Sequence, residues 1–83
     1  MLRITQRDDR ETLRLEGRLT RYEVALLRET LRRGPNGTRV IDLAGVAFLD
    51  EDGARTLIDL RQRGLELRGG SPFVKQLLLE VES

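Results

Sequence analysis

The stretch TRVIDLAGVAFLDEDGARTLIDLRQR, residues 38–63, decides the fold of this chain. It opens with the apolar, β-branched run 40–43, which is typical of a strand buried on both faces. A turn is expected at 44–45, and the apolar residues 46–49 are too few for a helix and predict a loop. The acidic turn 50–53 follows, and after it apolar residues recur at helical spacing. The stretch therefore predicts a strand, an apolar loop, an acidic turn and a helix, with the loop and turn as the best candidate for a functional surface.

Three carboxylates, Asp50, Glu51 and Asp52, stand immediately before that helix. Acidic side chains at this place accept hydrogen bonds from the free N–H groups of the first turn and lie at the positive end of the helix dipole. Each contributes about 0.3–1 kcal/mol through the dipole. The pattern therefore marks the start of a helix.

The other elements follow from the same spacing rules. Strands are expected over residues 2–6, 12–16 and 65–68, and helices over 21–33 and from 72 onward. Thr20 and Ser71 are the expected N-caps, and the stretch 34–37 (GPNG) is a strong stop after the first helix.

Two apolar residues, Tyr22 and Leu26, fall on the side of the first helix opposite its core stripe of Val24, Leu27 and Leu31. Isolated apolar residues on a surface are normal, and a contact patch for a partner or a second copy is the alternative. The sequence leaves both readings open.

Composition excludes several classes of protein. The chain has 83 residues, which predicts one domain over 1–83. Fifteen basic against fourteen acidic residues argue against binding to nucleic acid. The sequence holds no Cys and no His, which removes disulfides, thiolate metal sites and the commonest general base. No apolar segment reaches the length of a membrane span and no signal peptide is recognisable, so a cytoplasmic location is expected.

The residues 40–53, VIDLAGVAFLDEDG, resemble the core motif of STAS domains, the family of anti-sigma-factor antagonists and sulfate-transporter tails. Three further stretches fit the family in order: LEGRLT at 15–20, GLEL at 64–67 and SPFVKQLL at 71–78. The resemblance covers nearly the whole chain. With the order of elements, it implies an α/β fold: a small STAS-like sandwich in which one mixed four-stranded sheet packs against about three helices.

The resemblance also implies a role in transcription regulation or signalling in bacteria. In regulatory members, a partner kinase phosphorylates the first Ser of Asp-Ser-Ser-Gly, and the unmodified form binds an anti-sigma factor. Here Glu51 stands at this phosphosite-equivalent position, and neither it nor Asp52 accepts a phosphoryl group by serine chemistry. Glu51 imitates part of the charge of phosphoserine, or it is only a helix cap.

The leading interpretation is a non-enzymatic module that docks on an anti-sigma factor or related regulatory kinase through residues 48–58. The candidate partner-binding residues are Asp50, Glu51, Asp52, Gly53, Ala54, Arg55 and Ile58. A structural or scaffold STAS subunit of a transporter or self-assembling complex is the alternative.

No catalytic, cofactor or metal site is predicted. Asp42 with the three carboxylates at 50–52 lacks the EF-hand pattern for Ca²⁺, and Gly69-Gly70-Ser71 favours a turn with an N-cap over a phosphate cradle. A nucleotide or metal at the acidic turn is therefore the third and weakest hypothesis. Longer STAS domains carry a further strand and helix, and a sheet edge left bare here would favour pairing of two copies into a homodimer.

Overall fold

The central stretch folds as one strand, β3 (Val40–Leu49), followed by helix α2 (Glu51–Gln62). The computed structural model describes residues 1–33 and 37–82. Its remaining elements are β1 (Leu2–Gln6), β2 (Thr12–Leu19), α1 (Val24–Arg33), β4 (Glu66–Arg68) and α3 (Pro72–Glu82). The predicted stop at 34–37 lies outside the described residues except for its last glycine.

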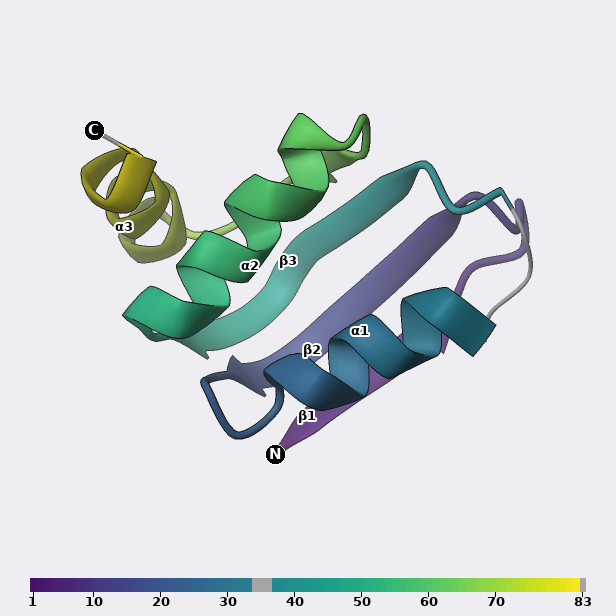
Figure 1. Cartoon of the computed structure of the whole chain (residues 1–83), viewed down its shortest axis with the longest axis horizontal. Helices are drawn as coiled ribbons and strands as arrows, with labels where there is room; N and C mark the ends of the chain where they lie inside the picture. The colour runs from purple at the N-terminus through teal and green to yellow at the C-terminus, as the bar shows by residue number, and fades with distance from the viewer. Residues whose placement is uncertain (34–36, 83) are drawn as a thin grey trace.

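The strands form one sheet in the order β1-β2-β3-β4. β1 runs antiparallel to β2, whereas β2 and β3, and β3 and β4, are parallel neighbours. Helices α1 and α2 lie side by side on one face of this sheet, and α3 lies beside α2 (Figure 1). The predicted α/β fold, with one mixed four-stranded sheet and three helices, is confirmed.

The predicted turn at 44–45 and apolar loop at 46–49 are wrong, because β3 continues through both. Opposite β2, the register shifts once between Asp42 and Gly45 and again between Val46 and Phe48, so β3 contains two bulges. The Asp42 carboxylate accepts a hydrogen bond from the Ala44 N–H at 2.9 Å, within the first bulge. Pairing with β2 thus overrides the local turn signal, and the bulges absorb the additional residues.

β2 is longer than predicted and passes through Gly17, whose φ is +97°. A Cβ there would collide with the Met1 carbonyl oxygen, and this same oxygen accepts the Arg18 N–H at 3.0 Å. Only glycine combines that backbone angle with so close an approach. The beginning of β1 is thereby held against β2 at Gly17 and Arg18.

Helix α1 begins at Val24 rather than at residue 21, because residues 21–23 form a turn. The Thr20 carbonyl oxygen accepts the N–H groups of Glu23 at 2.9 Å and Val24 at 3.1 Å. The Glu23 carboxylate in turn accepts the Thr20 N–H at 3.0 Å and a hydrogen bond from the Thr20 hydroxyl. Thr20 therefore stabilises the turn before α1, and the prediction that it is the N-cap of the helix itself is wrong.

One hydrophobic cluster fills the space between the sheet and its helices. Its fully buried large side chains are Leu15, Leu19, Leu27, Ile41, Leu43, Leu49, Leu57 and Val74. Burial of such a side chain is worth about 1.5–3 kcal/mol. This core fixes the end of β3 and the start of α2 relative to the end of β2, and the predicted site lies at that junction.

Among residues 1–33 and 37–82, no helix combines the length and the apolar character that crossing a bilayer requires.

Candidate functional site

Asp50 joins the two chain segments that meet at the predicted site. Its Oδ1 accepts the Gly53 N–H at 2.7 Å, which caps α2, and its Oδ2 accepts the Arg21 N–H at 2.9 Å. Its own N–H donates to the Leu19 carbonyl oxygen at 3.3 Å. One half-buried carboxylate therefore holds the start of α2 against the turn that precedes α1.

Glu51 and Asp52 occupy the first turn of α2, and both side chains are exposed. Among the described hydrogen bonds, neither side chain accepts an α2 N–H, so the predicted cap is supplied by Asp50 alone. Glu51 instead accepts two hydrogen bonds from Arg55 one turn later, at 3.1 Å from Nε and 2.5 Å from Nη2. This carboxylate raises the pKa of the Arg55 guanidinium.

Three predicted site residues lie in the interior. Gly53 is buried, and a Cβ there would collide with the Leu19 carbonyl oxygen and come within 2.9 Å of Leu49 Cδ1. Ala54 is completely buried, and Ile58 is only 8% exposed. The backbone at Gly53 and the side chains of Ala54 and Ile58 pack α2 onto the sheet. Asp50, Glu51, Asp52 and Arg55 are the accessible part of the predicted set.

A groove of about 330 Å³ runs between α1 and α2 next to these residues. Its lining consists of Arg21, Val24, Arg28, Asp52, Arg55 and Thr56. The charges of the lining are mixed, because Asp52 lies there with three arginines. Outside the lining, the Asp59 carboxylate lies 3.4 Å from the Arg28 guanidinium. The sequence predictions missed the two arginines of α1 and its preceding turn, because only the packing of α1 beside α2 brings them to this surface.

Phe48 lies within β3 and not in a loop, two residues before the α2 cap. Its ring stacks on that of Phe73 from α3, with ring centroids 5.8 Å apart. The Arg18 guanidinium lies 5.3 Å from the Phe48 ring centroid, a cation–π distance. The two rings remain 39% and 48% exposed, so this aromatic pair borders the site on its sheet side.

Comparison with known families matches residues 2–82 of the chain to the family described as "Mlab, STAS domain". The chain belongs to the STAS-domain family. No curated protein is significantly similar to it. STAS domains are in general interaction modules without catalytic activity.

Asp50-Glu51-Asp52-Gly53 is the stretch that resembles the STAS core motif, and the structure gives physical reasons for two of its positions. Asp50 supplies the cap and the link to Arg21, and Gly53 allows the backbone of α2 to approach the end of β2. Glu51, which the sequence predicts at the phosphosite-equivalent position, has a side chain that is 64% exposed. Its carboxylate is therefore accessible from solvent.

Two other predicted groups have local structural roles. The Asp42 carboxylate lies 3.9 Å from the Arg7 guanidinium, on the opposite end of β3 from Asp50. Ser71 Oγ accepts the Val74 N–H at 3.2 Å and so caps α3, as predicted. In the part of the chain that the structure describes, no three His, Cys, Asp or Glu residues are grouped as metal ligands.

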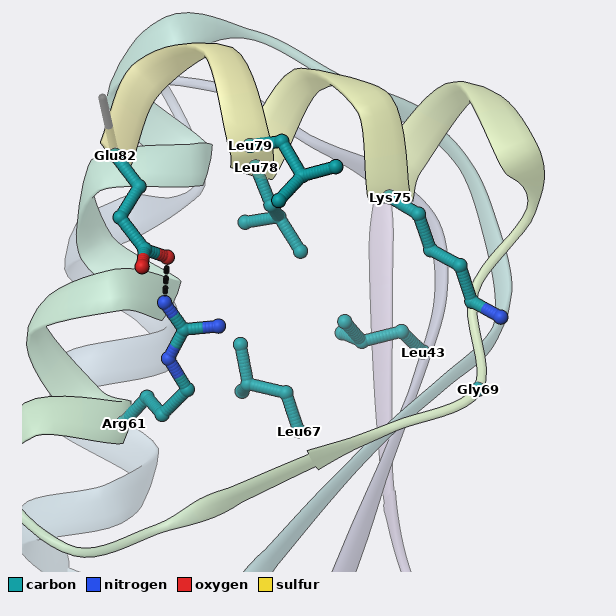
Figure 2. A pocket seen from close by; sticks show the side chains of 8 residues that line it. All are labelled: Leu43, Arg61, Leu67, Gly69, Lys75, Leu78, Leu79 and Glu82. Atoms are coloured by element: carbon teal, nitrogen blue, oxygen red, sulfur yellow. Dashed lines mark ion pairs between the residues drawn. The ribbon is translucent and has the colours of Figure 1, made fainter.

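A second hollow, of about 320 Å³, opens between α3, the end of α2 and strands β3 and β4 (Figure 2). Its lining consists of Leu43, Arg61, Leu67, Gly69, Lys75, Leu78, Leu79 and Glu82. At one end, Arg61 of α2 and Glu82 of α3 form an ion pair (Figure 2). This pair and the aromatic stack hold the two ends of α3 to the rest of the domain.

Proposed function

We propose that this STAS domain is a non-catalytic module that docks on an anti-sigma factor or related regulatory kinase. The docking surface consists of Asp50, Glu51, Asp52 and Arg55 at the start of α2, together with Arg21 and Arg28 across the groove. The observation that carries the proposal is the exposure of Glu51 and Asp52 on a helix start that the Asp50 hydrogen bonds hold in place. The partner class comes from the resemblance to the regulatory STAS proteins.

The chemistry of the docking surface favours a protein over a small substrate. Three arginines and the Asp52 carboxylate line an open groove. Charge complementarity to such a surface gives a protein interface its register and specificity. A substrate pocket instead buries most of its ligand among apolar side chains with a few convergent polar groups. The α1–α2 groove has a single aliphatic lining residue, Val24.

Glu51 keeps this surface in one charge state. Phosphoserine carries a charge of about −1.5 to −2 and has three acceptor oxygens, whereas Glu51 carries about −1 and is paired with Arg55. We therefore propose that phosphorylation at residue 51 does not switch this surface. Glu51→Ser should create a kinase substrate or change the affinity for the partner, and unchanged phosphorylation and affinity would rule out the phosphate-mimic idea.

The experiment begins with a pull-down from the host cell, followed by titration calorimetry with the recovered partner. Asp52→Lys should weaken binding at least about tenfold, because it places a like charge opposite the partner's complementary group. Asp8→Lys makes the same charge change in the turn between β1 and β2, at the other end of the sheet. Equal affinities of the two variants would contradict the proposed docking surface.

The second candidate is a structural or scaffold STAS subunit of a transporter or self-assembling complex. The observation in its favour is the ion-paired Glu51, since a permanent subunit needs no phosphorylation switch. Recovery of a membrane complex without a kinase-like protein would favour this candidate. Recovery of an anti-sigma factor or kinase would favour the first.

A further inference from the structure

β1 forms one edge of the sheet, and no other segment among residues 1–33 and 37–82 pairs with its outer side. Such an edge presents unpaired backbone N–H and C=O groups that can pair with another strand. This edge is two strands away from β3, which carries the docking surface at its end.

The hydrogen bonds at the ends of the hairpin show which backbone groups point outward. The Arg18 N–H donates to the Met1 carbonyl oxygen at 3.0 Å, and the Arg7 N–H donates to the Thr12 carbonyl oxygen at 2.9 Å. Because such pairs alternate along an antiparallel ladder, residues 1, 3, 5 and 7 bond to β2. The backbone groups of residues 2, 4 and 6 therefore face away from the sheet.

Two copies of this edge match each other in one antiparallel register. Ile4 then lies opposite Ile4 of the second copy, and Leu2 lies opposite Gln6 of the second copy. Each of these outward-facing pairs exchanges two hydrogen bonds. On the other face, Arg3 lies opposite Thr5 of the second copy and not opposite a like charge. A shift of the register by one pair would place Arg3 opposite Arg3 of the second copy, and the repulsion of these like charges is unfavourable.

The side chains also fit this register. Leu2 is 6% exposed and belongs to the hydrophobic cluster, against which the half-buried Ile4 packs. Pairing would bring the two Ile4 side chains together on the helix-covered face and remove their remaining surface from water.

Natural monomers protect an edge strand with proline, a bulge or charges directed inward. Residues 2–6 contain no proline, and their register with β2 is regular. Their single charge is Arg3, on the face away from the core. At the end of the proposed register Met1 meets Arg7 of the second copy, whose guanidinium lies 3.9 Å from its own Asp42.

We infer that the outer edge of β1 is a self-association surface, through which a second copy of this chain extends the sheet across a two-fold axis. The pairing has Ile4 at its centre. It leaves the docking surface on α2 free in both copies, so the dimer would present that surface twice.

The first test is sedimentation equilibrium over a range of protein concentrations, with circular dichroism as a check on folding. Gln6→Pro removes an outward N–H without removing any bond to β2, and it should weaken self-association by about tenfold or more. Gln6→Ala keeps that N–H and should leave self-association unchanged. A wild-type chain that is monomeric at every concentration, or a folded Gln6→Pro variant that still dimerises fully, would overturn the inference.

The second test uses the absence of cysteine from the chain. In the proposed register, Arg3 and Thr5 of the second copy form a non-hydrogen-bonded pair with Cα atoms about 4.5 Å apart, which suits a disulfide. A mixture of Arg3→Cys and Thr5→Cys chains in a glutathione buffer should therefore form a mixed disulfide dimer. Arg3→Cys alone should not, since equivalent Cα atoms are then about 7–8 Å apart.

Arg68→Cys, exposed on the β4 edge, is the matched control for collisions between free thiols. Mixed with Arg3→Cys it should form no more dimer than either variant alone. Equal cross-linking in all mixtures, or none in the mixture of Arg3→Cys with Thr5→Cys, would refute the β1 register even where the Gln6→Pro variant fails to fold. Neither test uses the protein that is proposed to bind the docking surface on α2. Their outcome is therefore independent of the test of docking.

Discussion

Replacing Asp50 with alanine removes two hydrogen bonds that hold separate parts of the chain together. The bond to the Gly53 N–H is an N-cap interaction, and loss of such a cap costs about 1 kcal/mol. The bond to the Arg21 N–H is more exposed, and its net contribution is about 0.5–1.5 kcal/mol. The expected loss of unfolding free energy is therefore about 2 kcal/mol.

This loss is large for a domain of 83 residues, whose total stability is about 4–12 kcal/mol. A domain of this size loses about 4–8 °C in Tm per kcal/mol, so Asp50→Ala should melt about 8–16 °C below the wild type. Urea unfolding followed by circular dichroism measures the free energy, and calorimetry measures Tm.

Two further variants serve as controls for Asp50→Ala. Asp50→Asn retains a side-chain oxygen acceptor, and because Asn is as good an N-cap as Asp it should lose less than half as much. Asp52→Ala removes a neighbouring exposed carboxylate that caps no N–H among the described bonds, and it should stay within about 0.5 kcal/mol of the wild type. If Asp50→Ala is no less stable than Asp52→Ala, the role assigned to the Asp50 link is wrong.

Gly53→Ala should destabilise the fold by about 1–3 kcal/mol, since its Cβ would collide with the Leu19 carbonyl oxygen and α2 would have to shift; a wild-type urea midpoint would contradict this packing. Glu23 has a pKa below its ordinary value of 4.5 because its carboxylate accepts a hydrogen bond from the Thr20 hydroxyl. A lowered folded-state pKa gives stability that is fully present above pH 4.5 and is lost as the pH falls through the folded value. The stability difference between the wild type and Glu23→Gln should therefore shrink on acidification, and a difference that grows would contradict the assigned direction.

The sequence predicted the elements whose signals are local. The capping residue Ser71, the alternation in β1 and the acidic start of α2 each depend on neighbouring residues, and the structure has them where they were expected. The prediction failed at 44–49, where a glycine suggests a turn when read alone. Pairing of β3 with β2 decides the conformation there, and no local pattern contains that information.

The candidate site was predictable only in part, because some of its residues come together through contacts between segments that are distant in the sequence. The exposure of Glu51 and Asp52 follows from the helix start. Helical spacing places Ala54 and Ile58 on the apolar side of this helix, and the structure has both buried. The contribution of Arg28 depends on how α1 lies beside α2, which is set by the packing of both helices on the sheet.

The two hydrogen bonds of the Asp50 carboxylate have a consequence for the binding of a partner. The Asp50 side chain fixes the spacing between the turn before α1 and the first turn of α2. The end of the α1–α2 groove next to Asp50 therefore has the same width in the free domain as in a complex. A surface that is preorganised in this way loses little conformational entropy on association. Affinity at this site would then depend mainly on how well the charges of the partner complement those of the groove. It would depend little on conformational change in this domain.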